Sequence, residues 1–422
     1  MSKNIILIKN ISLWKIKNLI SSYIGLPKAV FFLFLCRFIN GLGFFVFTFL
    51  TLFLTKNLSL SANKVGLYLM FVEFGRLIGS LIGGILADIF GRKIILLVFT
   101  FMWAFSLFPC AFLGNSLIIP IILIFVAFFD GVTRPVYDAL AADLSNSGNR
   151  KVIFSFLYLG LNLGVGVGNL MAGFLFDHYM HILFLGSAVA ILIAYLFIYQ
   201  FVLETLPYEI RLKNKNHVSI KKESLLATLI KRPVILYFLL VFILYFIVFS
   251  QLSFSLPLQI NNIFGQTGPR FFGIIMSFNC FHIVFMTVPI TVISQKYRPI
   301  LNLFFAGIFY AVGFGMLYWV NHFNWLLLST LIWTTGEILT FTNARVYISN
   351  QSPSTHQGRF NSLLTIGESI SRIIGPPMWG LVIVYLSIRQ VWIFSFAIAI
   401  IAAGMVYTIY FSEKKYHSLE TK

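Results

Sequence analysis

The feature that most constrains this chain is a series of long apolar runs separated by short polar connections. Each run has about 20 residues, the length that a helix needs to cross the hydrocarbon core of a bilayer. The runs occupy residues 30–55, 64–89, 94–113, 117–140, 152–176, 180–203, 234–260, 270–292, 299–320, 324–349, 360–385 and 390–411. We therefore predict an all-α membrane protein with twelve transmembrane helices, and the first run is too long for a cleaved signal peptide.

Composition argues against a soluble enzyme. Hydrophobic residues make up 59% of the 422 positions and charged residues only 10%, whereas soluble domains carry about 25% charged residues. The three cysteines, Cys36, Cys110 and Cys280, all lie in apolar runs and have no metal-ligand spacing. We therefore expect neither a metal site nor a cofactor.

The net charge of +18 is concentrated in alternate connections. Basic residues cluster in 1–29 and 204–233, and they recur in short connections at Arg92, Arg150 and Arg359. The positive-inside rule places such loops in the cytoplasm. We therefore expect both termini in the cytoplasm, a multi-pass protein of the bacterial cytoplasmic (inner) membrane, and no nucleic-acid partner.

The longest polar connection divides the predicted spans into two sets of six. Arg134-Pro135-Val136-Tyr137 ends the fourth span, and the similar Arg345-Val346-Tyr347 ends the tenth. Paired repeats are typical of secondary transporters, whose substrate site lies between the repeats near the membrane midplane. The predicted organisation is a cytoplasmic basic segment at 1–29, six-helix bundles at 30–203 and 234–411, a cytoplasmic central loop at 204–233 and a cytoplasmic tail at 412–422.

Between spans two and three the sequence carries Gly84, Asp88, Gly91, Arg92 and Lys93 in the spacing Gly-x-x-x-Asp-x-x-Gly-Arg-Lys. From the residues alone, we expect Gly84 to let two helices approach closely and Gly91 to permit a tight turn. The pattern resembles the loop signature of the major facilitator superfamily, with Ile89 where that family usually has a base. The resemblance implies the major facilitator fold of two pseudo-symmetric six-helix bundles.

The segment 139–143 and the following Arg150 resemble the fourth-to-fifth-span region of bacterial drug-exporter-like, proton-coupled members of that superfamily. The resemblance implies that a cytoplasmic gate is closed by a latch of loop cations and acids. The alternative is a solvated helix end with unrelated ion pairs. The predicted gate residues are Gly84, Asp88, Gly91, Arg92, Lys93, Asp143 and Arg150.

Spans five and eleven carry glycine-rich stretches. Gly164 and Gly168 lie one turn apart in span five, a pattern similar to that of the exporters except that Asn169 replaces a proline. Span eleven carries Gly375 and Pro376. A hinge and plain close packing of helices explain these four residues equally well.

Charged residues inside the predicted spans are candidates for the functional site, because an ionisable group at bilayer depth is costly unless it is paired. Asp130, Arg134 and Asp138 form a ladder at four-residue steps, and we expect Arg134 to bridge the two acids. Glu337 has no charged residue within one helical turn. Burial should therefore leave it at least partly protonated at neutral pH. Two further pairs are spaced to neutralise each other on one helix face: Glu73 with Arg76, and Glu368 with Arg372.

In the family fold, spans one, four, seven and ten line the central cavity. On that basis we predict Asp130 and Glu337 as the proton-coupling pair, and the alternative is that both form cavity-wall ion pairs with Arg37 and Arg134. A hydrogen bond between helices would explain Asn40 and Gln251 as well as a substrate contact does. The predicted cavity residues are Arg37, Asn40, Arg134 and Gln251.

Three functions remain open from the sequence. The first is a secondary active transporter that exports a small amphipathic molecule by alternating access in exchange for protons, with sodium as the alternative ion. The second is transport of an anionic metabolite or siderophore, in either direction, with Arg37 and Arg134 holding carboxylates. The third, a receptor or enzyme in the membrane, lacks any recognisable catalytic motif. We expect a monomer.

Overall fold

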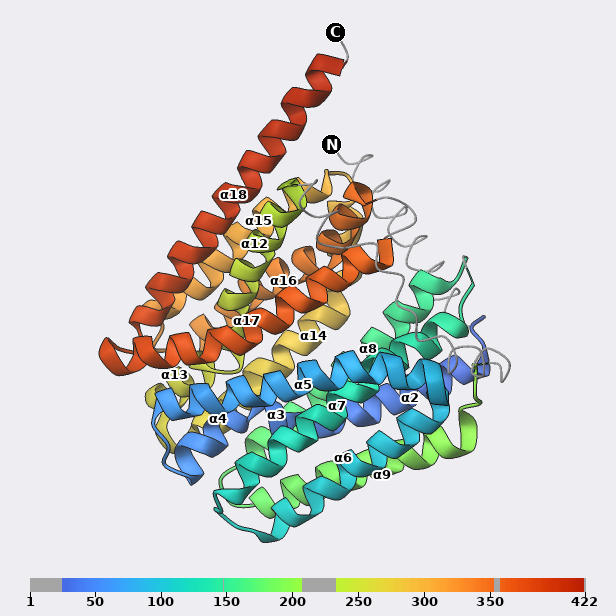
Figure 1. Cartoon of the computed structure of the whole chain (residues 1–422). Coiled ribbons are helices and arrows are strands. Elements are labelled where there is room, and N and C mark those ends of the chain that lie inside the picture. Colours follow the sequence, from blue (N-terminus) through green and yellow to red (C-terminus); the bar gives the residue numbers. More distant parts are fainter. Residues whose placement is uncertain (1–24, 147, 207–232, 353–356, 421–422) are drawn as a thin grey trace, which may run out of the picture.

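The computed structural model describes residues 25–146, 148–206, 233–352 and 357–420 (Figure 1). Residues 1–24 of the predicted basic segment and 207–232 of the predicted central loop lie outside this part. The first half of the protein comprises α2 (Lys28–Gly43), α3 (Phe45–Thr48), α4 (Leu50–Leu52), η1 (Phe53–Asn57), α5 (Ala62–Phe90), α6 (Arg92–Phe112), α7 (Ile118–Asp143), α8 (Arg150–Leu175) and α9 (Met180–Phe201). The second half comprises α12 (Pro233–Phe249), η2 (Ser250–Leu252), α13 (Ser255–Phe264), η3 (Gly265–Thr267), α14 (Gly268–Ser294), α15 (Pro299–Gly315), η4 (Met316–Tyr318), α16 (Phe323–Gln351), α17 (Gln357–Tyr385) and α18 (Gln390–Glu420).

The prediction of an all-α membrane protein is confirmed. Within the described residues, nine helical stretches are long and apolar enough to cross a membrane, and one of them, Pro233–Ser294, runs through α12, α13 and α14. The count of twelve spans and the cytoplasmic placement of the termini stay predictions.

Two predicted spans are interrupted, and a third is longer than expected. The first span, predicted as one helix, changes register at Phe44 and Phe49 and ends in the π-helical turn η1. The seventh breaks between η2 and α13. Pro257 then lies in the first turn of α13, where its missing N–H costs nothing. The helix α18 continues past residue 411 to Glu420, because Glu413 and Lys414 are good helix formers although they end the apolar run.

Close packing of α5 against α7 fixes the frame of the first half. A Cβ atom on Gly79 would lie 2.1 Å from the carbonyl oxygen of Phe128, and one on Gly83 would lie 2.3 Å from that of Val132. On the facing helix, a Cβ on Gly131 would lie 2.2 Å from the carbonyl oxygen of Arg76. Only glycine permits backbones to approach so closely. The crossing therefore places Arg76 of α5 beside Asp130 of α7.

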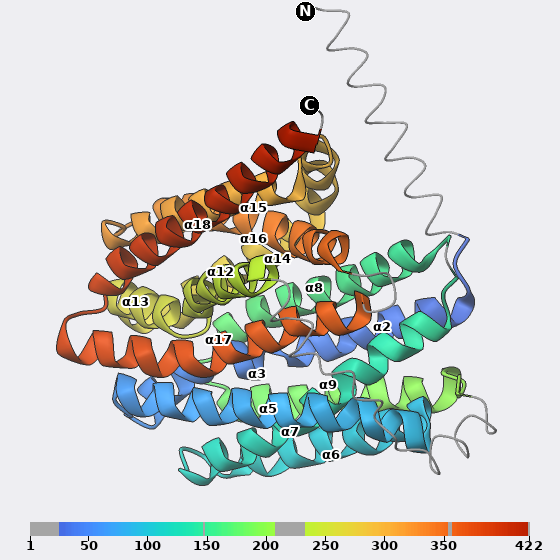
Figure 2. The ribbon, with the colours of Figure 1, turned by 45° about the horizontal axis from the view of Figure 1, so that its top comes forward.

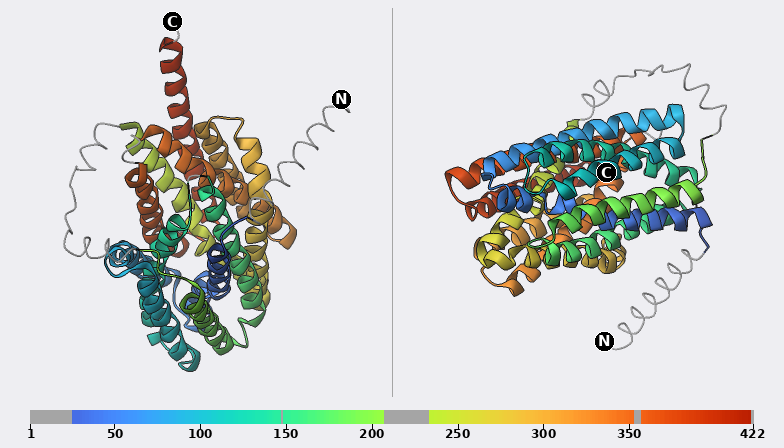
Figure 3. Two further views of the ribbon diagram at one scale, coloured as in Figure 1. Left: turned by 90° about the vertical axis from the view of Figure 1, so that its right-hand side faces the viewer. Right: turned by 90° about the horizontal axis from the view of Figure 1, so that it is seen from below.

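Alternate ends of the helices define two faces. We call one the basic face, which the sequence predicts to be cytoplasmic; it carries the connections 90–92, 143–150 and 294–299. We call the opposite one the distal face; it carries the connections 57–62, 264–268 and 385–390. In Figure 2 most helices of the first half lie below those of the second half, and α8 and α17 lie at a similar height between them. The carboxyl-terminal end of α18 projects beyond the bundle (Figure 3).

The two halves are closely packed near the distal face. There α5 contacts α17 and α8 contacts α14. A Cβ on Gly66 would lie 2.6 Å from the carbonyl oxygen of Pro376, and one on Gly173 would lie 3.0 Å from the Cα of Gly273. The Thr51 hydroxyl also donates a 2.5 Å hydrogen bond to the carbonyl oxygen of Ser253 across the halves. In Figure 1 the ribbons of the two halves converge around α4 and α13 and diverge toward the opposite ends of the helices.

Candidate functional site

A cavity lies between the two halves and consists of three adjoining volumes of about 360, 320 and 230 Å³. The two larger volumes share Arg37, Asp138, Leu161 and Arg345, and Phe341 links the largest volume to the smallest. The smallest volume reaches the buried residues Asn279 and Glu337. The halves are closely packed near the distal face. Arg345, which lines the two larger volumes, lies in the part of α16 nearer the basic face. In this conformation the cavity is therefore on the basic-face side.

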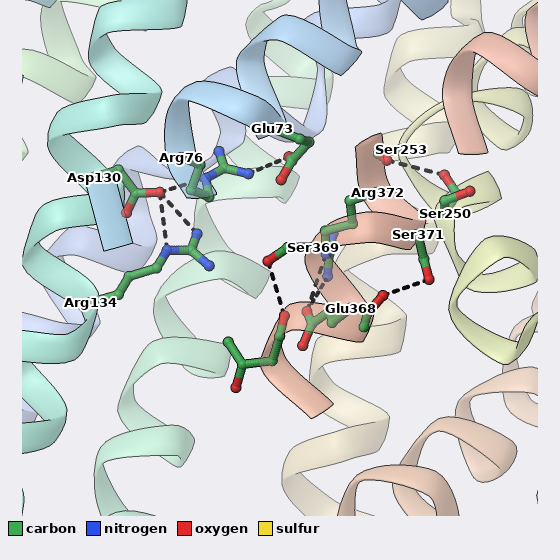
Figure 4. Close-up of polar contacts among 12 residues, drawn as sticks. Glu73, Arg76, Asp130, Arg134, Ser250, Ser253, Glu368, Ser369, Ser371 and Arg372 are labelled. Carbon is green, nitrogen blue, oxygen red and sulfur yellow. Dashed lines mark hydrogen bonds and ion pairs between the residues drawn. The ribbon is translucent and has the colours of Figure 1, made fainter. Parts of the chain in front are cut away.

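Four charged residues from α5 and α7 form one cluster in the cavity wall, which we call the acid–arginine cluster: Glu73, Arg76, Asp130 and Arg134 (Figure 4). Asp130, with only 5% of its surface exposed, accepts three hydrogen bonds on Oδ2. One comes from Arg76 Nε at 2.9 Å, and two come from Arg134, from Nη2 at 2.9 Å and Nε at 3.2 Å. Arg76 also pairs with Glu73, and its guanidinium lies over the Phe47 ring, 4.4 Å from the centroid.

This geometry corrects the predicted ladder. Arg134 does not bridge Asp130 and Asp138, because both of its donors go to the single Oδ2 of Asp130. Asp138 pairs instead with Arg37 of α2, at 3.2 Å. Arg76, predicted to neutralise only Glu73, also binds Asp130 through the helix crossing described above. Spacing along one helix cannot reveal this contact between helices.

The start of the cavity wall in α2 combines charge with aromatic rings. The Arg37 guanidinium lies 4.3 Å from the centroid of the Tyr137 ring, and Asn40 Nδ2 donates a 2.8 Å hydrogen bond to the Tyr137 hydroxyl. Arg37, Asn40 and Arg134 all line the middle volume of the cavity. Gln251 does not line these volumes. Its side chain is fully buried and donates to Ser395 Oγ of α18 at 3.3 Å, so it is a helix–helix contact.

Glu337 of α16 is buried and bound by a neutral partner. Asn279 Nδ2 of α14 donates to Glu337 Oε2 at 2.9 Å, and the same amide reaches Thr334 Oγ1 at 3.0 Å. In the described part of the chain no Lys, Arg or His forms an ion pair with it. The other titratable and charged groups that face it are Tyr158 of α8, Cys280 of α14, Tyr310 of α15 and the Glu368–Arg372 pair of α17.

Asp130 and Glu337, the predicted coupling pair, differ in their surroundings. Asp130 lines the middle volume and is held by two arginines, whereas Glu337 lines the smallest volume and is held by an amide. The two volumes share Phe44 and Val165. A carboxylate between two guanidinium groups keeps its negative charge, while a buried carboxyl without a cation favours its neutral form. The two predicted coupling residues are therefore held in different ways, Asp130 by cations and Glu337 by a neutral amide.

The predicted gate residues lie together at the basic face of the first half. Arg92 pairs with Asp88 at 3.2 Å and with Asp143 at 3.1 Å, and Gly91 has φ 106°, a conformation that favours glycine. Arg150 lies over the Phe154 ring, 5.9 Å from its centroid. The Arg92–Asp143 pair is intact while the cavity lies on this side. The contact therefore braces the first half and does not by itself close the cavity.

Two predictions about glycines have different outcomes. A Cβ on Gly84 would meet no heavy atom within 4 Å, so the close approach expected there is wrong and belongs to Gly83. A Cβ on Gly164 would lie 2.0 Å from the carbonyl oxygen of Phe38, and one on Gly168 would lie 2.4 Å from that of Leu42. Gly375 packs against the Ser250 side chain, and the Pro376 backbone against Gly66. All four hinge-or-packing residues thus sit in close helix contacts.

Three residues of the site were not predicted from the sequence. Glu204, after α9, accepts the backbone N–H groups of Arg92 at 3.0 Å and Lys93 at 3.1 Å, and so caps the start of α6. No local pattern links residues 112 positions apart. Asn279 could have been found as a polar residue within an apolar run. Arg345 was visible in the repeat, but its place in the cavity was not predicted.

No group of three or more His, Cys, Asp or Glu side chains that could hold a metal occurs among the described residues.

Comparison with known proteins agrees with this architecture. The family model described as Major Facilitator Superfamily matches residues 33–376, so the chain belongs to the major facilitator superfamily. It is a transporter of that superfamily, with the fold of a multi-pass integral membrane protein, and the predicted resemblance is confirmed.

Individual relatives are distant. A "Na(+), Li(+), K(+)/H(+) antiporter" of Planococcus maritimus is 24% identical over 364 residues, 80% of this chain and 85% of the relative. A "Tetracycline resistance protein, class H" of Pasteurella multocida is 26% identical over 365 residues, 84% and 88% of the two chains. The crystal structure of the nucleoside transporter NupG superposes with a TM-score of 0.75 at 14% identity, covering 91% of this chain and 99% of NupG. At that identity the likeness concerns the fold alone.

Proposed function

We propose that this protein exports a small amphipathic molecule in exchange for protons, with its basic face toward the cytoplasm of a bacterial cell. The observation that carries the proposal is the environment of Glu337, a buried carboxyl that lines the cavity and has an amide partner in place of a cation. The names of the two relatives, an ion/proton antiporter and a tetracycline-resistance protein, agree with it.

Alternating access gives Glu337 its role. When the cavity opens to an acidic exterior, Glu337 takes up a proton, because a neutral carboxyl is favoured in a buried site. When the cavity opens to the cytoplasm, the proton leaves and the carboxylate becomes available to a substrate. Asp130 keeps its charge throughout, since Arg76 and Arg134 surround it. Asp130 then orders the wall of the cavity and does not carry the proton.

The second candidate function is transport of an anionic metabolite or siderophore by Arg37 and Arg134. Each of these arginines is already paired with an acid, Arg37 with Asp138 and Arg134 with Asp130. A substrate carboxylate would have to displace those acids, which makes this candidate weaker than proton-coupled export.

The test is accumulation of tetracycline in everted membrane vesicles with a proton gradient as the sole driving force. The wild type should accumulate it. Glu337→Gln should not, although it should still equilibrate tetracycline down its gradient. Glu413→Gln is the matched control, because Glu413 binds Tyr347 and Gln351 outside the cavity, and it should behave as the wild type. A second arm measures proton efflux from the vesicles on addition of Na⁺, Li⁺ or K⁺.

Accumulation by Glu337→Gln against the tetracycline gradient would contradict the role of Glu337, and the same assay on Asp130→Asn would then decide whether Asp130 carries the proton. A wild type that moves neither tetracycline nor the three cations under a proton gradient would count against export of this kind.

A further inference from the structure

The charges around the cavity are balanced in all but two places. Arg37 pairs with Asp138, and the acid–arginine cluster contains two arginines and two acids. Arg372, which lines the smallest volume, pairs with Glu368 at 3.0 Å. In the described part of the chain this leaves one acid and one cation of the cavity without a partner of opposite charge. They are Glu337 and Arg345.

The internal repeat explains why Arg345 is unpaired among the described residues. Arg134 and Arg345 occupy matching positions of the repeat, in the second half of α7 and of α16 respectively. One turn earlier, α7 has Asp130, which neutralises Arg134, whereas α16 has Phe341. Arg345 is exposed and lines both larger volumes of the cavity. The second half thus keeps the cation of the repeat and replaces its acid by an aromatic ring.

Glu337, Phe341 and Arg345 follow one another at four-residue steps along α16. Eight residues of α-helix rise about 12 Å, so the acid and the cation lie at opposite ends of a stretch with Phe341 between them. Phe341 lines both the largest and the smallest volume and thereby connects the two charged ends. Tyr158 of α8 also lines the largest volume, and Phe44 of the first half lines the other two.

We propose that the substrate is a zwitterion with an apolar body, whose cationic group binds Glu337, whose anionic group binds Arg345 and whose body lies against Phe341. This second proposal rests on the proposed function, and it names the class of substrate that the same site binds. A zwitterion leaves the cavity neutral when Glu337 is ionised, whereas an organic cation or anion alone leaves one charge unbalanced. A proton on Glu337 removes the partner of the cationic group. Proton and substrate then compete for Glu337, as exchange requires.

Binding to the purified, detergent-solubilised protein without any gradient tests the proposal. The probe is a biphenyl with an aminomethyl group at one para position and a carboxylate at the other. Its methyl ester carries only the cation, and its N-acetyl derivative carries only the anion. The wild type should bind the zwitterion about tenfold or more tightly than either derivative, since each derivative loses one charge-assisted contact.

Each variant should remove one preference and keep the other. In Arg345→Gln the Kd of the zwitterion should rise about tenfold to that of the ester, while the ester binds as before. In Glu337→Gln the zwitterion should bind like the N-acetyl derivative, which itself is unaffected. The unchanged Kd of the derivatives shows that each variant is folded. Arg389→Gln is the matched control, because Arg389 binds Asn321 at the distal face, and it should change none of the three Kd values.

Equal Kd values for the three compounds in the wild type, or no detectable binding of any, would overturn the proposal. So would an Arg345→Gln protein that still prefers the zwitterion to the ester. None of these three results bears on proton-driven transport in vesicles, and a failure of that transport leaves the binding preferences untouched, so the two proposals fail separately.

Discussion

Replacing Asp130 by Asn should destabilise the protein far more than replacing Asp138 by Asn, although both acids belong to α7 and both pair with an arginine. Asp130 is 5% exposed and takes three hydrogen bonds from two guanidinium groups. The Asp138 side chain is 65% exposed and takes one from Arg37. Removing one partner of a buried ion pair costs about 3–5 kcal/mol, whereas an exposed pair contributes about 0.2–1 kcal/mol.

The assay is the midpoint of thermal unfolding in detergent, followed by the loss of monodisperse protein on size-exclusion chromatography. Asp130→Asn should lower the midpoint markedly, and Asp138→Asn should hardly move it. The double variant Asp130→Asn/Arg134→Gln should recover part of the lost thermal stability. It leaves one acid, Glu73, with one arginine, Arg76, so that the charges of the cluster are balanced again. Equal shifts for the two single variants would refute the claim that the acid–arginine cluster is a buried, mutually dependent unit.

Three further predictions follow from other contacts. Arg134→Lys should impair transport, because an ammonium cannot donate from two nitrogen atoms to Asp130 Oδ2 as the guanidinium does, and wild-type vesicle transport would contradict this. Arg92→Ala should lose transport but still insert into the membrane, since it removes the contact with the partly buried Asp143, worth about 1–3 kcal/mol, and the contact with the exposed Asp88, worth about 0.2–1 kcal/mol. Glu204→Gln should have a smaller effect in the same direction, and full activity of both variants would exclude a bracing role. Gly173→Val should disfavour the conformation described, because a Cβ there lies 3.0 Å from Gly273 Cα. A cysteine introduced near the distal face should then be labelled faster by a thiol reagent, and an unchanged labelling rate would argue against this contact as the distal closure.

The sequence alone is enough to predict the helical class and to recognise the loop signature. Both depend on local properties, namely the length of the apolar runs and the spacing of Gly91 and Arg92. It predicts partners across helices poorly. Asp130 has an arginine four residues away and another, Arg76, 54 positions away, and only the glycine crossing of α5 and α7 brings the second one into contact. The same limit explains the misassigned Gly84, since neighbouring glycines of one helix face different directions.

Glu337 illustrates the opposite case. Its isolation was visible in the sequence because α16 has no charged residue within a turn of it, and only its neutral partner, Asn279, required the structure. Gln251 and Asn40 looked alike as polar residues in apolar runs, yet one lies between helices and the other lines the cavity. Burial inside a bundle cannot be read from residue type.

The most direct test of the central claim, that Glu337 holds a proton, is infrared difference spectroscopy of the reconstituted protein between neutral and alkaline pH. A protonated carboxyl has a C=O stretch that a carboxylate lacks, and no substrate is needed. We predict that the wild type and Asp130→Asn show this band at neutral pH and lose it on alkalinisation, and that Glu337→Gln lacks it. A wild type without the band, or a band that persists in Glu337→Gln, would contradict the claim.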